Sequence, residues 1–136
     1  MKLTNTKSLK RKSGMTLLEL TVVILVLLSL ISILFIGARA WKKGSDKAGC
    51  ILNLRNVQLA VRSQANLNNL AIDDALLNGA LIGAGLYMES APTCPGDHTA
   101  YTFGTTVPAV GTLYATCGNG DATIKATHVP TSHTDW

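Results

Sequence analysis

Residues 14–36 read GMTLLELTVVILVLLSLISILFI, and this stretch decides the fold of the chain. From Leu20 to Ile36 every side chain is apolar except one threonine and two serines. Apolar and small residues on either side, out to Met15 and Ala38, bring the run to about 20 residues, the length at which an α-helix crosses a bilayer. The sequence therefore predicts a transmembrane helix over residues 15–40.

The positive charge of the chain is concentrated before this helix. Residues 1–14 carry five lysine or arginine side chains and no acid, so the other seven basic residues face all 8 acidic ones. Basic residues on one side of a membrane helix place that side in the cytoplasm. We therefore expect residues 1–14 to be a cytoplasmic leader and the chain beyond the helix to lie in the periplasm or outside the cell. The same distribution argues against a nucleic-acid-binding surface, because the positive charge does not gather on the remaining part.

Glu19 is the one acid within the apolar segment. An ionised carboxylate at the centre of a bilayer costs roughly 2.5 to 3.5 kcal/mol, so it should have a specific partner. Two plainer interpretations stay open: a signal anchor without further role, and a secretory signal cleaved at Ala38-Arg39-Ala40, which has the small-x-small pattern of such sites. The length of the apolar run and the acid inside it argue against the cleaved signal.

A second helix pattern follows the membrane segment, over residues 41–70. Leu52 and Leu59 form a thin apolar stripe there, with a fuller stripe on the opposite side. Either a head domain covers the fuller stripe and a neighbouring molecule the thin one, or one small domain buries both. Gly44 and Gly49 each weaken a helix by about 1 kcal/mol relative to Ala and predict a kink or a softened turn. The fuller stripe recurs at intervals of 4, 3, 4 and 4 residues, as on the buried face of an amphipathic helix: Cys50, Leu54, Val57, Val61 and Ala65.

The sequence of residues 71–136 predicts a small head domain. The later part of this region is rich in Thr, Gly, Tyr and Val, which favours short strands. Ala100–Phe103 and Leu113–Thr116 are expected to form a β-hairpin, with a further strand at Thr123–Ala126 and a mobile tail from His128 to Trp136. The predicted fold class is therefore α+β: a long N-terminal helix, half membrane-spanning and half amphipathic, packed on a small antiparallel β head.

The chain has three cysteines, Cys50, Cys94 and Cys117. Cys94 precedes the first predicted strand and Cys117 ends the second, so both lie at the same end of the hairpin. In an oxidising compartment a disulfide between them would close a loop of about 24 residues and stabilise the head by roughly 3 kcal/mol. The state of Cys50 stays open. The cysteines and histidines lack the close paired spacing of a zinc site, and we expect no such metal.

The heptapeptide Gly14-Met15-Thr16-Leu17-Leu18-Glu19-Leu20, after a basic leader and before the apolar run, resembles the processing motif of type IV pilin-like proteins, including type II secretion pseudopilins. The match covers residues 10–36, and the plan of a long helix followed by a small β head is similar too. A looser similarity, to a pseudopilin subgroup with a short cysteine-flanked head, includes Cys50, Cys94-Pro95-Gly96, Tyr101 and Cys117.

The resemblance implies that a membrane prepilin peptidase cuts after Gly14 and methylates the new N-terminus at Met15. Glu19 corresponds to the family's acid, the fifth residue of the processed chain. A buried carboxylate needs a cation, and cleavage creates an ammonium at Met15, so pairing between subunits would satisfy both charges and set their register. Thr16 would add a hydrogen bond at the same place.

By this resemblance the chain is a structural subunit of a type IV pilus-like or type II secretion pseudopilus filament. Its expected partners are the prepilin peptidase, homologous pilin or pseudopilin subunits, an inner-membrane assembly platform and membrane lipid, with no nucleic acid. The expected location is the inner membrane, with a single pass, and after assembly a cell-surface filament or a periplasmic pseudopilus. The alternative is a signal-anchored periplasmic binding module or a minor tip pilin that acts in adhesion or DNA uptake.

The sequence departs from the family at three points. Met15 stands where the family more commonly has phenylalanine. No proline interrupts the helix between Met15 and Lys43. The calcium loop of the major secretion pseudopilin is not clearly present, and Asn119 and Asp121 are the oxygen ligands that suggest one. Nothing in the sequence resembles a nucleophile elbow, a phosphate loop or paired carboxylates, so we expect no enzymatic activity and no cofactor other than a possible calcium ion.

Overall fold

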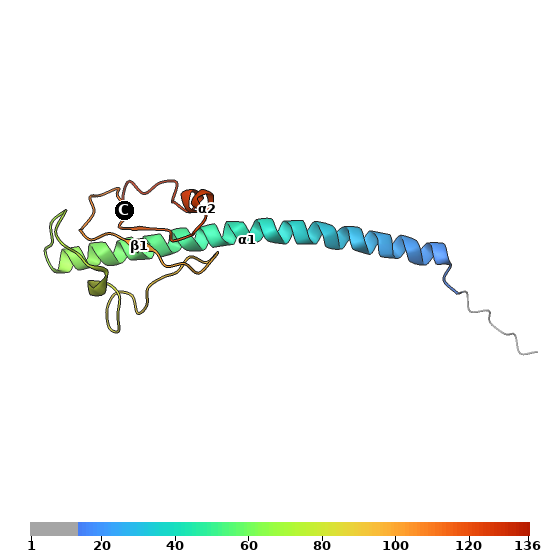
Figure 1. Ribbon diagram of the computed structural model, residues 1–136, viewed down its shortest axis with the longest axis horizontal. Coiled ribbons are helices and arrows are strands. Elements are labelled where there is room, and N and C mark those ends of the chain that lie inside the picture. Colours follow the sequence, from blue (N-terminus) through green and yellow to red (C-terminus); the bar gives the residue numbers. More distant parts are fainter. Residues whose placement is uncertain (1–13) are drawn as a thin grey trace, which may run out of the picture. The chain divides into compact units, whose positions relative to one another are not determined.

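The computed structural model describes residues 14–136, so the predicted leader lies, apart from Gly14, outside the described residues. One long helix and a small two-stranded antiparallel sheet make up most of the regular structure, which confirms the predicted α+β class (Figure 1). In chain order the elements are α1 (Leu17–Leu67), the 3₁₀ helix η1 (Asn78–Ala80), β1 (Thr102–Phe103), β2 (Ala115–Thr116) and α2 (Ala122–Thr127).

The first half of α1 is long and apolar enough to cross a membrane. Its most apolar window of 18 residues has a mean hydropathy of 3.0, and the rest of the described chain buries none of it. The three polar side chains in this run do not need water, because Thr21, Ser29 and Ser32 each donate a hydrogen bond to a carbonyl of the preceding turn, at 2.7–2.8 Å. A segment whose polar groups are satisfied internally is suited to the hydrocarbon core of a bilayer.

Internal contacts divide the chain into two compact units between Arg39 and Ala40. Helix α1 begins in the first unit and ends in the second, and it is helical from end to end. The two glycines Gly44 and Gly49 therefore do not interrupt the helix, and the kink or softened turn expected there stays a prediction. Gly49 also has a packing role: a Cβ atom there would lie 3.0 Å from Cγ of Pro95, so the glycine lets this loop approach the helix closely.

The core of the second unit forms along one side of α1. The side chains of the predicted stripe are at most 5% exposed, whereas Leu52 and Leu59 on the opposite side are each 58% exposed. The amphipathic prediction is confirmed, and of its two open alternatives the one in which a single domain buries both stripes is wrong. The buried stripe consists of Cys50, Leu54, Val57, Val61 and Ala65.

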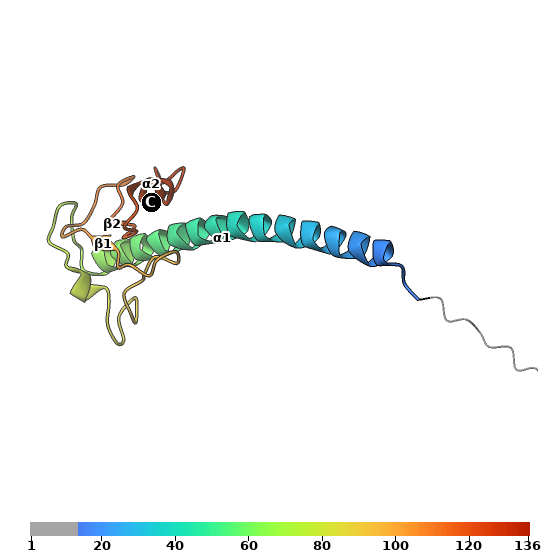
Figure 2. The ribbon, with the colours of Figure 1, turned by 45° about the vertical axis from the view of Figure 1, so that its right-hand side comes forward.

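The predicted β-hairpin is present, with strands shorter than expected. Thr102 pairs with Thr116 and Phe103 with Ala115 in antiparallel register, and β1 and β2 lie beside α1 (Figure 2). Gln58 of α1 fixes this placement, because its amide nitrogen donates to the Thr112 carbonyl and its amide oxygen accepts from the backbone N–H of Tyr114, both at 3.0 Å. A buried glutamine is stable here because both ends of its amide are paired.

The last predicted strand is wrong, since Ala122–Thr127 is helix α2. Asp121 explains the difference: its carboxylate accepts hydrogen bonds from the backbone N–H groups of Thr123 and Ile124, as an N-cap residue does. The C-terminal tail, which was expected to be mobile, instead contacts the head. Arg62 of α1 donates hydrogen bonds of 3.0 Å to the Trp136 backbone oxygen and of 2.7 Å to the Pro108 carbonyl, so the tail is held against the head.

Candidate functional site

The start of α1 is a reciprocal capping arrangement between Thr16 and Glu19. The Thr16 hydroxyl accepts from the Glu19 backbone N–H at 3.3 Å, and the Glu19 carboxylate accepts from the Thr16 backbone N–H, also at 3.3 Å. This is the T-x-x-E capping box, in which two N–H groups at a helix N-terminus are satisfied at once. Before any partner arrives, the acid of the apolar segment therefore has a local structural use.

Gly14 and Met15 lie just before the N-terminus of α1, and both are exposed. A Cβ atom added to Gly14 would meet nothing within 4 Å, and its backbone is not in the left-handed region that favours glycine. The Met15 side chain is 72% exposed. The fold of the described residues thus gives no reason for a glycine at position 14. Peptidase cleavage here and the charge pairing of Glu19 stay predictions.

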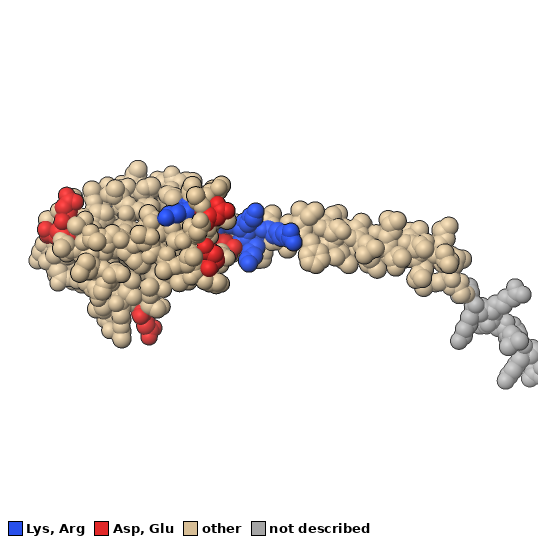
Figure 3. Space-filling view, viewed as in Figure 1, with Lys and Arg blue, Asp and Glu red and all other residues tan. Residues whose placement is uncertain are grey.

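The helix that follows carries a continuous apolar surface. From Leu17 to Ile36 its large apolar side chains are all between 47% and 82% exposed within the described chain. The view in Figure 3 has no charged side chain along the middle of this surface and shows lysine and arginine gathered on α1 just beyond it. An apolar surface of this extent has to be covered by lipid or by other helices.

A different cluster lies inside the second unit and joins three cysteines to one histidine. The sulfur atoms of Cys50, Cys94 and Cys117 and a ring nitrogen of His128 all lie within 4.8 Å of one another. All four residues are buried, with exposed fractions of 0%, 0%, 2% and 4%. Nδ1 of His128 is 3.6 Å from the Cys117 sulfur and 3.9 Å from that of Cys94.

Four separate segments supply these side chains. Cys50 belongs to the buried stripe of α1, Cys117 follows β2 directly, and His128 is the residue that ends α2. Cys94 starts a tight turn, in which its carbonyl accepts from the His98 N–H at 2.8 Å and its N–H donates to the Thr99 carbonyl at 2.9 Å. The cluster therefore exists only when the helix, the loop, the hairpin and the last helix are all in place.

Neighbouring donors point at the sulfur atoms. The Tyr101 hydroxyl donates to the Cys50 sulfur at 2.8 Å, and the Asn119 side-chain amide donates to the Cys94 sulfur at 3.6 Å. Burial raises the pKa of the Cys50 and Cys117 thiols, and for Cys117 a hydrogen bond from the Asn119 backbone opposes that rise. Free of any ligand, these thiols are neutral and shielded, which is unlike the thiolate of a catalytic nucleophile.

The disulfide expected between Cys94 and Cys117 is not formed in the structure, where all three cysteines are free thiols. Their sulfurs are near one another, as the hairpin predicted, and the Cys50 sulfur lies within 4.8 Å of both. Asp97 and His98, which follow Cys94 closely in the sequence and carry side chains that can bind metals, are not members of the cluster. His98 is exposed, and the Asp97 carboxylate accepts instead from the hydroxyl of Thr99 at 2.6 Å.

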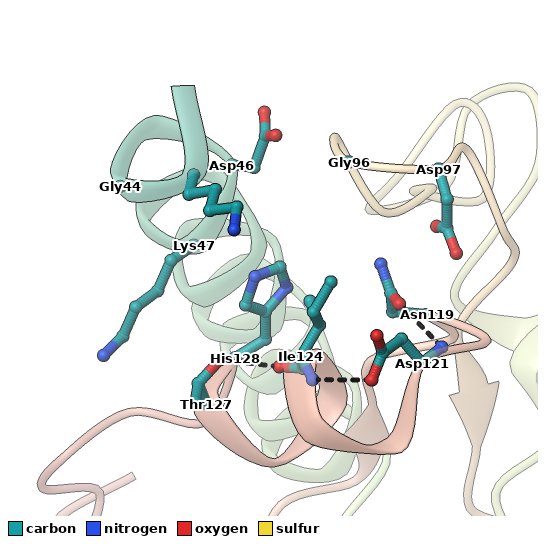
Figure 4. Close-up of a pocket in the computed structure, with 11 residues that line it drawn as sticks. Gly44, Asp46, Lys47, Gly96, Asp97, Asn119, Asp121, Ile124, Thr127 and His128 are labelled. Carbon is teal, nitrogen blue, oxygen red and sulfur yellow. Dashed lines mark hydrogen bonds between the residues drawn. The ribbon is translucent and has the colours of Figure 1, made fainter. Parts of the chain in front are cut away.

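The two calcium candidates lie in a groove next to the cluster, at the start of α2 (Figure 4). Their oxygens already have partners in the fold. Oδ1 of Asn119 accepts from the Asp121 N–H at 2.9 Å, and Oδ1 of Asp121 accepts from the Thr123 N–H at 2.8 Å. Hydrogen bonds from the backbone N–H groups of Thr123 and Ile124 lower the pKa of the Asp121 carboxyl. Both residues thus have structural roles, and calcium binding stays an untested prediction.

Sequence reasoning rejected His128 as a partner of Cys94 and Cys117 because of its spacing, and it missed Cys50 altogether. Its zinc criterion was a pair of closely spaced ligands, whereas here His128 lies 11 positions after Cys117 and 34 after Cys94. One available signal was the place of Cys50 on the predicted buried stripe. Comparison of the chain with protein-family models, curated proteins and solved structures found no match.

Proposed function

We propose that this chain is a structural subunit of a pilin-like filament, made as a membrane-anchored precursor and cleaved after Gly14. The observation that carries the proposal is the junction at the start of α1. An exposed glycine with no role in the fold stands before a capped helix, and that helix has a membrane-length apolar surface with no cover within the described chain. An anchor alone would not need the glycine.

Cleavage converts this anchor into an assembly element. Hydrolysis of the bond between Gly14 and Met15 leaves a carboxylate on the leader and an ammonium on Met15. In a filament the apolar surface of α1 leaves lipid for the corresponding helices of other subunits, where an isolated carboxylate is costly. The Met15 ammonium of a neighbouring subunit then pairs with Glu19, and the pair sets the register between subunits.

The second half of α1 offers a further contact in the same filament. Leu52 and Leu59 lie on the face that the head leaves uncovered. Two leucines, each 58% exposed on one helix side, suit the packing of a neighbouring subunit. The partners in this proposal are the prepilin peptidase, like subunits and an assembly platform in the inner membrane, and the head faces the periplasm.

The mature N-terminus tests the proposal. We expect mass spectrometry of the membrane-extracted protein, produced with a prepilin peptidase, to find a processed chain that begins at methylated Met15. Gly14→Val should leave the full-length precursor, because a branched side chain blocks the peptidase without touching the fold. Gly44→Ala is the matched control, since a Cβ there also meets nothing within 4 Å, and it should be processed normally.

Other N-termini would contradict the proposal in distinguishable ways. A chain that starts at Trp41 would show cleavage by signal peptidase after Ala40. An uncut chain in the presence of active peptidase would leave a plain signal anchor, which is the form expected of a periplasmic binding module.

A further inference from the structure

The filament proposal makes no use of the cluster of Cys50, Cys94, Cys117 and His128. These are the three cysteines of the chain, and all four residues are buried at a single point of the head. Buried thiols and imidazoles that serve only as apolar filling have no reason to converge with their polar atoms facing one another. The convergence of four such atoms points to a shared ligand.

The distances fit a tetrahedral metal ion. With Zn–S bonds of about 2.3 Å and a Zn–N bond of about 2.1 Å, tetrahedral angles place a sulfur and a nitrogen about 3.6 Å apart and two sulfurs about 3.8 Å apart. The His128 nitrogen lies 3.6 Å and 3.9 Å from two of the sulfurs. The longest separation among the four ligand atoms is no more than 4.8 Å, so small side-chain adjustments reach the ideal geometry.

From this geometry we propose that the four residues bind one Zn²⁺ ion in a structural Cys₃His site. Soft thiolates and an imidazole in tetrahedral array select zinc over magnesium or calcium. Four protein ligands leave no open position for a substrate, so the site holds the fold together and performs no reaction. The proposal does not depend on whether the chain forms filaments.

The surroundings suit the charge of the bound site. Binding releases the protons of the three thiols, so three thiolates and a neutral imidazole around Zn²⁺ carry one net negative charge. The Tyr101 hydroxyl and the Asn119 amide donate to two of the sulfurs, which stabilises thiolates and orients them. Gly118 admits the close packing just after Cys117, because a Cβ atom there would collide with the Ala100 carbonyl.

The competing arrangement is the disulfide between Cys94 and Cys117 with Cys50 as a free thiol. It uses two of the four residues and gives no role to Cys50 or His128. The two arrangements exclude each other, because a disulfide sulfur is not a thiolate ligand. Replacement of Cys50 distinguishes the two arrangements, because it abolishes a zinc site and leaves the Cys94–Cys117 disulfide unchanged.

The first measurement is the metal content and thiol state of the full-length protein, purified in detergent without chelator. We expect about one zinc per chain and three cysteines that become alkylated only after metal removal. Exchange for Co²⁺ should give the intense visible absorption of tetrahedral cobalt with a thiolate charge-transfer band. Zinc removal by a chelator should lower the thermal midpoint of the head, and added Zn²⁺ should restore it.

Variants assign the ligands. Cys50→Ser and His128→Ala should each lower zinc content by about tenfold or more under the same purification, because each removes one of four ligands. His98→Asn is the matched control: it removes an exposed histidine of the same head, at a left-handed backbone position that asparagine tolerates, and should keep its zinc.

Two results would overturn the proposal. One is wild-type protein without zinc that contains the Cys94–Cys117 disulfide. The other is wild-type protein with three free thiols whose midpoint and absorption do not change on addition of Zn²⁺ or Co²⁺. Both are read from the wild-type chain, so they decide the matter even if the variants do not fold.

Discussion

At the scale of single residues, Glu19 has two separable roles. In the structure it caps the start of α1 by accepting from the Thr16 backbone. In the proposed filament it also carries the charge that meets the ammonium of Met15. The capping role needs a side-chain oxygen, whereas the pairing role needs a negative charge. Glutamine satisfies the first requirement and fails the second.

We therefore expect Glu19→Gln to keep the helix start, membrane insertion and cleavage, and to lose assembly. Removing one partner of a buried charge pair costs about 3 kcal/mol or more, so filaments should fall by more than about tenfold. Shearing of filaments from cells, followed by immunoblotting, measures the effect. Thr16→Ala is the control, because it removes the hydroxyl of the cap but keeps the charge, and it should retain most filaments. Normal filament levels in Glu19→Gln would sink the charge-pair account.

At the scale of elements, α1 performs two tasks with one continuous backbone. Its first half is apolar on all sides, and its second half buries a single stripe against the head. The two glycines at the start of the second half differ in their surroundings. Position 44 is open, while position 49 faces the ring of Pro95 in the loop next to Cys94. Helix propensity assigns the same penalty to Gly44 and Gly49, and only their packing distinguishes them.

This difference predicts opposite responses to alanine. Gly44→Ala should stabilise the head by up to about 1 kcal/mol, since alanine is the better helix former and meets no neighbour. That gain corresponds to a rise of about 4 °C in thermal midpoint for a unit of this size. Gly49→Ala should show no rise, because its Cβ would press on Pro95. Circular dichroism melts of the detergent-solubilised chain measure both, and equal gains would mean that the contact with Pro95 is not tight.

At the scale of the whole head, side chains of α1 bind segments that are remote in the sequence. Arg62 donates to the carbonyls of Pro108 and Ala109 and to the Trp136 backbone oxygen, at 2.7–3.0 Å. Arg55 makes a weaker contact, with its guanidinium 5.9 Å from the centre of the Trp136 ring. Hydrogen bonds from a charged group are worth more than an exposed cation–π contact.

Arg62→Ala should therefore lower the free energy of unfolding by about 2 kcal/mol, since it removes three hydrogen bonds from a charged donor and leaves the Pro108 carbonyl without its partner. Arg55→Ala, the matched control two turns earlier on the same helix face, should cost about 0.5 to 1 kcal/mol. Urea unfolding in detergent, followed by tryptophan fluorescence, compares the two. A smaller loss for Arg62→Ala than for Arg55→Ala would mean that water replaces the arginine without cost.

The sequence by itself determined the membrane-length helix, the buried stripe from Cys50 to Ala65 and the hairpin, because hydropathy and periodicity are local properties of the chain. It also marked the junction from Gly14 to Glu19, where spacing along a few residues carries the chemistry. It failed at α2, where one capping residue, Asp121, outweighed strand propensity.

The tertiary structure alone decided that Cys50 and His128 lie beside Cys94 and Cys117. Cys94 and His128 are 34 positions apart, and Cys50 comes from a different element again, so no local pattern connects them. Packing of the loop, the hairpin and α2 onto α1 brings their polar atoms within 4.8 Å. A metal site requires atoms at one point in space, and that point is defined only after the chain has folded.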